Sequence, residues 1–329
     1  MAERIVFEGE LDLEHLNLIK ALSAREMYVE ELAQIAERDE RIVITGADVG
    51  AGGKIGEFKE KYPDRFIDTG IAEADQVGVS AGMALNGKIV YLAGFGPFLA
   101  LRALDQVHTD VAYQNIPVRI VNTHSGLTSG GGPTHYNIMD LAVMRDLPNM
   151  TVIAPSDSAQ CIKAIRATLE YPGPVCFRIA RGAEPAVYTT QDYDYEVGKA
   201  ITALDGTDLT IIATGSLVAL SISAANGLAK EGVSVRVIDM FTWKPLDEEL
   251  VIKAAKETGA IVTAENHNVT CGLGSVVSNC LAKNCPTVQE FVGVQDLFGQ
   301  VGPQDFLMDE YGLRAANIVA TVKKAISRK

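Results

Sequence analysis

Glu73 is the first residue in this sequence whose type and place could do chemistry. It follows Gly70-Ile71-Ala72 and begins a run of small and apolar residues that extends to Leu85. A carboxylate at the start of a helix can simply stabilise the positive end of that helix. It can also be a partly buried acid that is available for hydrogen bonding or proton transfer. The pattern by itself leaves both interpretations open.

A second segment, 94–102, combines glycine, proline and two aromatic residues directly after an apolar run. Phe95 and Phe98 are separated by Gly96-Pro97, and Leu101 lies one turn further on. Phenylalanines in such a loop often fill the protein core. The alternative is that they form a flat apolar wall against an aromatic ring of a ligand.

A third segment places two histidines around a glycine-rich loop. His124 and His135 flank Gly130-Gly131-Gly132. Consecutive glycines allow the backbone to approach a ligand closely. Either histidine alone is more often structural, but two around one loop favour a binding or catalytic site. The loop is not a P-loop, because the GxxxxGK[ST] pattern is absent.

The elements that must position these residues alternate between strand-like and helical patterns. Strands are predicted near 41–45, 88–92, 118–122, 150–153 and 175–179, with helices near 72–85, 98–114, 137–145 and 158–170. A further helix is expected to begin with the capping box Ser23-Ala24-Arg25-Glu26. This alternation predicts an α/β fold with a mostly parallel sheet and ligand-binding loops at the carboxyl ends of its strands. The helix at 72–85 is expected to be buried, since it has no charged residue after Asp75.

The alternation is interrupted at 181–198, which reads as a linker because of its Gly, Pro and tyrosine-rich polar run. A second alternation begins at 209–213. We therefore expect two successive α/β domains with mostly parallel sheets. The first covers 1–190, including an N-terminal extension, and the second covers 191–329.

Composition excludes several classes of protein. The chain has 29 Lys+Arg against 42 Asp+Glu, so its net charge is −13, which does not suit nucleic acid or an anionic membrane as a partner. The five cysteines have no CxxC spacing, which argues against a disulfide scaffold or a zinc site. No signal peptide and no apolar run of membrane-spanning length is visible. A cytoplasmic protein is expected.

Together the three segments resemble the transketolase-like, thiamine-diphosphate-dependent enzymes. The matching motifs are Gly70–Glu73, Phe95 with Phe98, His124, Gly132–His135, Arg145–Asn149, and later the pattern Glu265-Asn266-His267 followed by Gly272-Leu273-Gly274. The GDG element of this family, which holds Mg²⁺ and the diphosphate, is absent. The chain therefore resembles the C-terminal subunit of a split transketolase, with the pyrimidine-binding and C-terminal domains.

The resemblance implies a role for each site residue. Glu73 would bind N1′ of the cofactor aminopyrimidine and favour the tautomer that removes the C2 proton, while Phe95, Phe98 and Leu101 would pack around that ring. His124 and His135 would bind sugar hydroxyls and help to move protons. Arg25 matches an arginine that holds the terminal phosphate of the donor, and Lys54 is a nearby replacement for clamp residues that are missing here.

The implied reaction is transfer of a two-carbon ketol unit from a ketose to an aldose phosphate. It requires an N-terminal subunit that carries the diphosphate and Mg²⁺, so no metal site is expected in this chain, which would dimerise with itself within an α₂β₂ complex. Two departures affect the donor: Ala154 stands where the family has a clamp arginine, and the glycine-rich loop lacks the usual aspartate. We therefore expect a donor that differs from xylulose 5-phosphate.

Three alternatives compete with this interpretation. The β subunit of a 2-oxo-acid dehydrogenase E1 shares the same pair of domains, but the Pro133-Thr134-His135 loop favours transketolase. A 1-deoxyxylulose-5-phosphate synthase has a single, much longer chain. A sugar-binding or structural module without activity is disfavoured, because the acid, both aromatic residues and both histidines are all retained.

Overall fold

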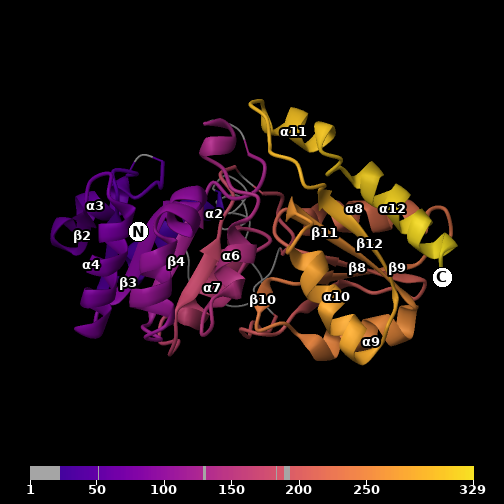
Figure 1. The fold of residues 1–329 in the computed structure, drawn as a ribbon, viewed down its shortest axis with the longest axis horizontal. Coiled ribbons are helices and arrows are strands. Elements are labelled where there is room, and N and C mark those ends of the chain that lie inside the picture. Colours follow the sequence, from indigo (N-terminus) through magenta and orange to yellow (C-terminus); the bar gives the residue numbers. More distant parts are fainter. Residues whose placement is uncertain (1–22, 51, 129–130, 183, 189–192) are drawn as a thin grey trace.

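The computed structural model describes residues 23–50, 52–128, 131–182, 184–188 and 193–329. These residues form two α/β lobes side by side, each with a central sheet and helices on its faces (Figure 1). Most strand pairs in both sheets are parallel. The predicted fold class is therefore confirmed.

The first lobe contains a seven-stranded sheet with the strand order β10-β5-β6-β4-β3-β1-β2. Its strands are β1 Ile42–Gly46, β2 Phe66–Asp68, β3 Ile89–Phe95, β4 Val118–Thr123, β5 Thr151–Ile153, β6 Val175–Arg178 and β10 Thr242–Lys244. Strands β1 and β4 are buried at every position. A strand covered on both faces is mostly apolar, which is why β1 is recognisable in the sequence, whereas β4 also buries Arg119, Asn122 and Thr123.

The helices of the first lobe place the site residues at the carboxyl edge of this sheet. They are α2 Ala24–Ile35, α3 Gly56–Lys61, α4 Glu73–Leu85, α5 Leu104–Gln106, α6 Asp140–Asp146 and α7 Ser158–Thr168, with π-helical turns at Phe98–Arg102 and Val107–Ala112. Helix α2 begins with the predicted capping box between Ser23 and Glu26 and packs against α7. This fixes Arg25 in the first turn of a buried helix.

Helix α4 differs from its prediction as a buried helix. Gln76, Val77 and Ala81 are buried, but Gly82 and Leu85 lie on an exposed face, and Ile71 just before the helix is 76% exposed. The absence of charge on this face therefore does not mean that the same chain covers it.

The second lobe has a five-stranded sheet with the order β12-β11-β8-β9-β7. Its strands are β7 Ile201–Leu204, β8 Leu209–Ala213, β9 Val235–Asp239, β11 Ala260–Asn268 and β12 Val288–Val294, and its helices are α8 Leu217–Ala229, α9 Glu248–Thr258, α10 Leu273–Asn284, α11 Gln304–Glu310 and α12 Ala315–Ser327. The second alternation predicted from 209–213 begins with β8, but the sheet also contains β7, which precedes it in the chain.

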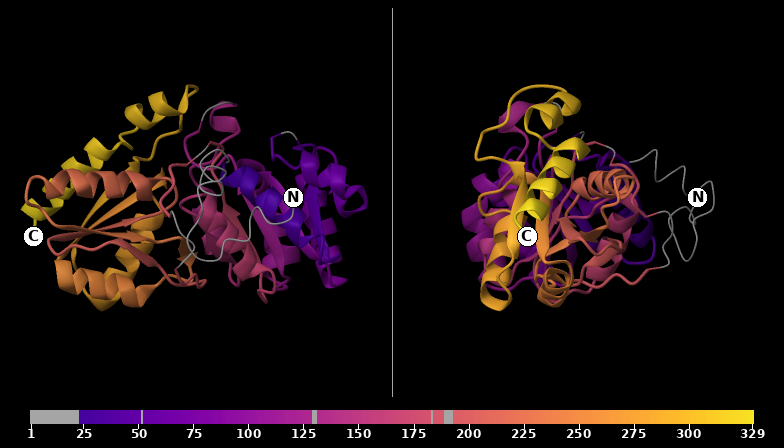
Figure 2. Two further views of the ribbon diagram at one scale, coloured as in Figure 1. Left: turned by 180° about the vertical axis from the view of Figure 1, so that it is seen from behind. Right: turned by 90° about the vertical axis from the view of Figure 1, so that its right-hand side faces the viewer.

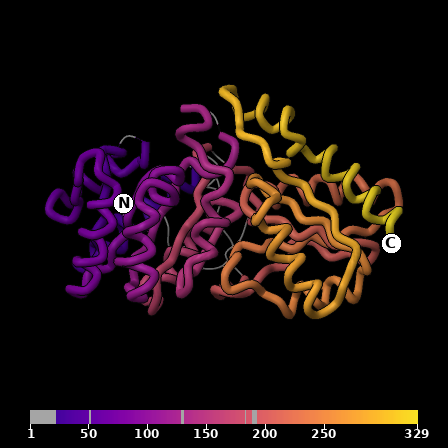
Figure 3. Tube along the Cα trace, in the orientation of Figure 1, coloured from indigo at the N-terminus to yellow at the C-terminus, as the bar shows by residue number. Residues whose placement is uncertain are grey.

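The two lobes are joined by more than the linker. Strand β10 comes after β9 in the chain but pairs antiparallel with β5 of the first sheet. The described residues of the 181–198 segment form no helix or strand, as predicted, whereas the expected boundary between 190 and 191 lies outside the described residues. The tube in Figure 3 and the views in Figure 2 show that the chain before α11 returns to the first lobe.

The described residues include no helix that is both long and apolar enough to cross a membrane. The five cysteines are all free thiols.

Candidate active site

The carboxyl edge of the first sheet brings the predicted substrate residues together in one pocket of about 400 Å³. The last residue of β3, the loops after β1, β4 and β6, and the start of α2 contribute to it. The lining residues are Arg25, Gly52, Lys54, Phe95, His124, Gly131, His135 and Arg181. Gly131 is the described part of the glycine-rich loop, and Ser129 and Gly130 lie outside the described residues.

Three basic side chains line this pocket in a chain that is acidic overall. Arg25 is 9% exposed and donates from Nη1 to the carbonyl of Gly52 at 2.6 Å, while its Nε is buried without a hydrogen-bond partner among the described residues. Burial and the nearby Arg181 guanidinium lower the pKa of Arg25. Lys54 is held 3.1 Å from Glu26 Oε1. Such a concentration of positive charge in a pocket is a site for an anion.

His124 is buried at the wall of the same pocket. Its φ of +60° is uncommon for a residue other than glycine, and its Nδ1 lies 3.0 Å from Thr123 Oγ1. Burial, together with the positive charges of Arg25 and Arg181, lowers the pKa of His124 to about 3. At neutral pH the ring is therefore an uncharged group that donates a hydrogen bond from one nitrogen and accepts one at the other.

This environment predicts an unusual titration for His124. Its imidazole signal in NMR should show no protonation between pH 8 and pH 5, because burial and two arginines disfavour the imidazolium. Addition of inorganic sulfate should raise the pKa, since a bound anion offsets the charge of Arg25 and Arg181. A His124→Gln variant assigns the signal, and His108, which does not line the pocket, is the control. Titration of His124 near pH 6.5 without anion would contradict this geometry.

Aromatic rings connect the pocket to the buried acid. Phe95 lies 4.0 Å from His124 and 5.7 Å from Phe98 between ring centroids, in a stacked arrangement with Phe98. His135 is exposed and packs edge-on against Phe98 at 5.4 Å. The two phenylalanines thus form a wall beside the histidines. Leu101 is 45% exposed on the same π-helical turn as Phe98.

Glu73 is the first residue of α4 and is only 3% exposed. Both of its carboxylate oxygens accept from Arg102 Nη1, at 2.9 and 2.8 Å. The guanidinium of Arg102 also lies over the ring of Phe98, 4.4 Å from its centroid. A buried carboxylate and an aromatic face therefore hold one planar group of N–H donors between them.

This arrangement tests whether the residues fit an aminopyrimidine. Such a ring is flat, carries N–H donors and needs an acceptor at its edge and an apolar surface at its face. The guanidinium of Arg102 is also flat and carries N–H donors, and it binds the Glu73 carboxylate with its edge and the Phe98 ring with its face. The residues present fit the pyrimidine end of thiamine diphosphate. Among the described residues, no group of three His, Cys, Asp or Glu side chains is arranged to hold a metal ion.

Sequence reasoning missed two residues of the site. Arg181 lies just beyond β6, so the strand-end rule would have found it, but its position before the Gly and Pro residues placed it in the linker. Arg102 lies in the same π-helical turn as Phe98, and the sequence carries no signal that it pairs with Glu73, 29 residues away.

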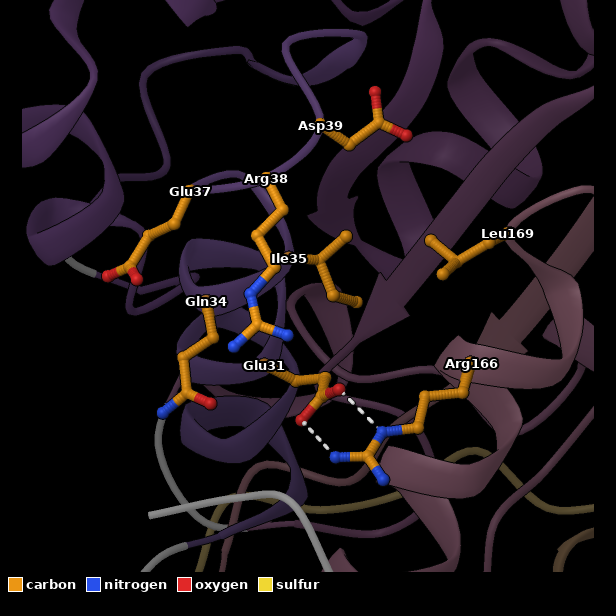
Figure 4. A pocket seen from close by; sticks show the side chains of 8 residues that line it. All are labelled: Glu31, Gln34, Ile35, Glu37, Arg38, Asp39, Arg166 and Leu169. Carbon is orange, nitrogen blue, oxygen red and sulfur yellow. Dashed lines mark hydrogen bonds and ion pairs between the residues drawn. The ribbon is translucent and has the colours of Figure 1, made fainter. Parts of the chain in front are cut away.

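A second pocket, of about 260 Å³, lies between the end of α2 and α7 (Figure 4). It is lined by no histidine and no phenylalanine among the described residues. Its buried acid, Glu31, is paired with Arg166 at 2.7 Å. The aromatic and cationic arrangement described above belongs to the first pocket.

Comparison with known families and proteins identifies both parts of the chain. Residues 20–185 match the family model described as "Transketolase, pyrimidine binding domain" and residues 198–318 match "Transketolase, C-terminal domain". The chain is 42% identical to the 6-deoxy-6-sulfo-D-fructose transketolase subunit SqwH of Clostridium sp. (strain MSTE9), over 93% of this chain and 95% of that protein. It is 37% identical to a subunit of the apulose-4-phosphate transketolase of Phocaeicola vulgatus, over 93% of this chain and 98% of that protein.

A solved structure described as "Split gene transketolase, inactive beta4 tetramer" superimposes with a TM-score of 0.87 at 38% identity, covering 93% of this chain and 99% of that one. The alternative of a 1-deoxyxylulose-5-phosphate synthase is less well supported, because such a synthase of Geobacter sulfurreducens is 35% identical and only 49% of its length is matched. The chain thus belongs to the transketolase family, where it corresponds to the C-terminal subunits of split transketolases.

Proposed function

We propose that this chain supplies the pyrimidine half of a thiamine-diphosphate-dependent active site that transfers a two-carbon ketol unit from an anionic ketose to an aldose phosphate. The observation that carries the proposal is the continuity of the site. The buried carboxylate of Glu73 and the ring of Phe98 both contact Arg102, and Phe98 stacks on Phe95 at the wall of a cationic pocket. A cofactor ring and a charged sugar can thus be held side by side.

The residues of this chain bind and orient, and some can move a proton. Glu73 would bind N1′ of the aminopyrimidine in place of Arg102, and Phe95, Phe98 and Leu101 would cover the ring and exclude water, which strengthens the Glu73 contact. When bound, thiamine diphosphate supplies the nucleophilic carbon that accepts the ketol unit. His124, uncharged at neutral pH, would hydrogen-bond the sugar. His135 would donate or accept a proton at a sugar hydroxyl.

The basic pocket would hold the terminal anion of the donor. Arg25, Lys54 and Arg181 all line it, and Ala154 leaves the arginine position of the common clamp without a charge. The two relatives described above are transketolase subunits named for a sulfonated ketose and for a sugar phosphate. A ketose other than xylulose 5-phosphate that ends in a sulfonate or a phosphate is therefore the proposed donor class.

Loss of one pocket cation should weaken turnover of anionic donors selectively. Because a hydrogen bond to a charged group contributes about 1.5–3 kcal/mol, Arg181→Gln is expected to lower kcat/KM for a ketose sulfonate or phosphate by about 10–150-fold. Turnover of the matching ketose without the anion should change little. Arg41→Gln, at an exposed arginine paired with Asp39, is the matched control. Equal loss for charged and neutral donors would argue against an anion contact.

The diphosphate and Mg²⁺ would be held by a separate N-terminal subunit, since this chain contains no GDG element. Two copies of each subunit would form an α₂β₂ complex. A reducing compartment such as the cytoplasm suits the five free thiols.

The exposed face of α4 supports self-association of this chain. Ile71 and Leu85, just before and at the end of this helix, are 76% and 69% exposed, and Tyr113, directly after the π-helical turn that packs against it, is 80% exposed. Gly82 lies on the same face, and a Cβ there would meet no atom within 4 Å. Glycine in a helix interior is less stable than alanine by roughly 0.5–1 kcal/mol, so a contact outside the chain explains Gly82 better than its own packing does.

Gly82→Arg should therefore reduce the oligomeric state without unfolding the chain. The added side chain has open space in the isolated chain, whereas it would block the close approach of a second copy. Light scattering is expected to show a smaller species than the wild-type chain forms, with little change in melting temperature. Gly227→Arg in α8, where a Cβ is equally unobstructed, is the matched control. An unchanged mass for Gly82→Arg would exclude α4 from the self-interface.

A further inference from the structure

The loop that carries both pocket histidines packs into the second lobe rather than only into its own. Leu127, Tyr136 and Ile138 are buried in the hydrophobic cluster that forms the core between α8, α12 and the second sheet. These residues lie between or just after His124 and His135 in the chain. The shape of this loop thus depends on the C-terminal lobe.

Asn266 at the end of β11 makes close polar contacts to this loop. Its Oδ1 accepts from the backbone N–H of Leu127 at 2.8 Å, and its Nδ2 donates to the carbonyl of the same residue at 3.3 Å. One side chain therefore satisfies both backbone groups of Leu127. Gly126, with φ +78°, lies so close that a Cβ there would be 2.7 Å from Asn266 Nδ2. The fit between the loop and this side chain is tight.

Further contacts from the second lobe hold the other end of the loop. The hydroxyl of Tyr136 donates to the carbonyl of Gln300 at 2.7 Å, and the N–H of Asn268 donates to the carbonyl of Ile138 at 2.8 Å. A Cβ on Gly299 would come within 1.9 Å of the Tyr136 hydroxyl. Gly299 and Gln300 belong to the segment that arches back to the first lobe before α11 in Figures 1 and 2.

The anchored loop is linked directly to the backbone of His124. The N–H of Asn137 donates to the carbonyl of His124 at 3.2 Å, and the N–H of Gly126 donates to the carbonyl of Asn137 at 2.7 Å. Arg178 joins the two lobes at this point, because it pairs with Asp140 at 3.2 Å and donates to the Asn266 carbonyl at 2.9 Å. A shift of β11 would therefore move the loop and His124 with it.

The end of β11 is itself held rigidly. Glu265 is fully buried and accepts from the N–H groups of Leu273 at 2.7 Å and Gly274 at 2.9 Å, at the start of α10. Successive side chains of a strand point to opposite faces, so Glu265 faces α10 while Asn266 faces the loop. The middle residue of the Glu265-Asn266-His267 motif, Asn266, is thus the one that contacts the first lobe.

We propose that Asn266 is a positioning residue, through which the C-terminal lobe sets the places of His124 and His135 in the donor pocket without touching the substrate. The expected effect of Asn266 on turnover rests on the proposed function, whereas its effect on the positions of the two histidines does not. Because small displacements of a catalytic group lower reaction rates steeply, the lobe would contribute to donor use although Asn266 hydrogen-bonds Leu127 and not the cofactor residues Glu73, Phe95 or Phe98.

Two independent substitutions in the second lobe test this proposal. Asn266→Leu removes both hydrogen bonds at nearly constant volume, and Thr258→Val is its control, because Thr258 is equally buried and its hydroxyl bonds lie within the second lobe. Gly299→Ala forces the Tyr136 hydroxyl to move, and Gly227→Ala, where a Cβ meets nothing, is its control. Gly299 lies in a surface segment, so this variant should fold even if Asn266→Leu does not.

The first readout uses the imidazole NMR signals of the isolated full-length chain. Both test variants should shift the signals of His124 and His135 and leave that of His108 in place, while neither control shifts them. The second readout uses the enzyme reconstituted with its N-terminal partner. There, kcat/KM for the donor should fall about tenfold or more, and the dissociation constant of thiamine diphosphate should change less than about twofold.

His124 and His135 signals at wild-type positions in the folded variants would overturn the proposal. So would an equal loss of cofactor affinity and donor turnover, because general destabilisation would then explain the effect. If the reconstituted wild-type enzyme shows no ketol transfer, the proposed function fails, and the NMR comparison still decides whether Asn266 positions the histidines.

Discussion

Glu73→Gln in the assembled enzyme is expected to lower ketol transfer by about two to three orders of magnitude, or roughly 3–4 kcal/mol in the activation barrier. Glutamine keeps the size of the side chain but cannot exchange a proton with N1′ of the aminopyrimidine. The effect should be large because the carboxylate is 3% exposed, so water does not replace its contact. Steady-state assays at saturating thiamine diphosphate measure it.

Two controls separate chemistry from folding in this experiment. Asp75→Asn changes an exposed acid in the same first turn of α4 and should leave turnover near the wild-type value. Melting temperature and assembly with the partner should be similar for both variants. Near-normal activity of Glu73→Gln would remove Glu73 from the reaction and with it the proposed place of the cofactor.

The isolated chain should show no ketol transfer, and addition of the N-terminal subunit should generate it. The chain offers an acceptor and an aromatic wall for the pyrimidine end, but its sequence contains no GDG element for the diphosphate and Mg²⁺. Mixing the subunits and assaying transfer from an anionic ketose to an aldose phosphate tests this dependence. The structurally similar split-gene transketolase is likewise described as an inactive tetramer.

The reconstitution has a built-in control. A mixture of the N-terminal subunit with the Glu73→Gln chain should form the complex but stay nearly inactive. This result would show that turnover takes place at the site that the two subunits share. Turnover by the isolated chain, or by the partner without this chain, would mean that the two subunits do not share one active site.

Much of the first lobe could be predicted because its strands are covered on both faces. Strand β3 reads as an apolar run that ends at Phe95, and His124 comes directly after β4 at the start of the loop that contains the glycines. Strand β10 was not predictable from the sequence. It is only three residues long, and it is stabilised by pairing with β5, which is distant in the sequence and belongs to the first sheet. Propensity likewise predicts a helix at 98–114 but not its π-helical turns.

The residues of the site divide in the same way. Residues that follow a strand or begin a helix, such as His124 and Glu73, could be predicted as site residues from the sequence pattern. Arg102, Arg181 and Asn266 act through partners that are distant in the sequence: Arg102 pairs with Glu73, Arg181 lines the same pocket as Arg25, and Asn266 binds Leu127 in the other lobe. Only the fold brings these pairs together.

Calorimetric titration with thiamine diphosphate in the presence of Mg²⁺ tests the central claim most directly, namely that this chain provides one half of a shared cofactor site. The titration is made on this chain alone, on the N-terminal subunit alone and on the mixture. We expect weak binding to each subunit and tight, Mg²⁺-dependent binding to the mixture, with one cofactor for each pair of subunits and loss of affinity in the Glu73→Gln mixture. Tight Mg²⁺-dependent binding to this chain alone would contradict the account.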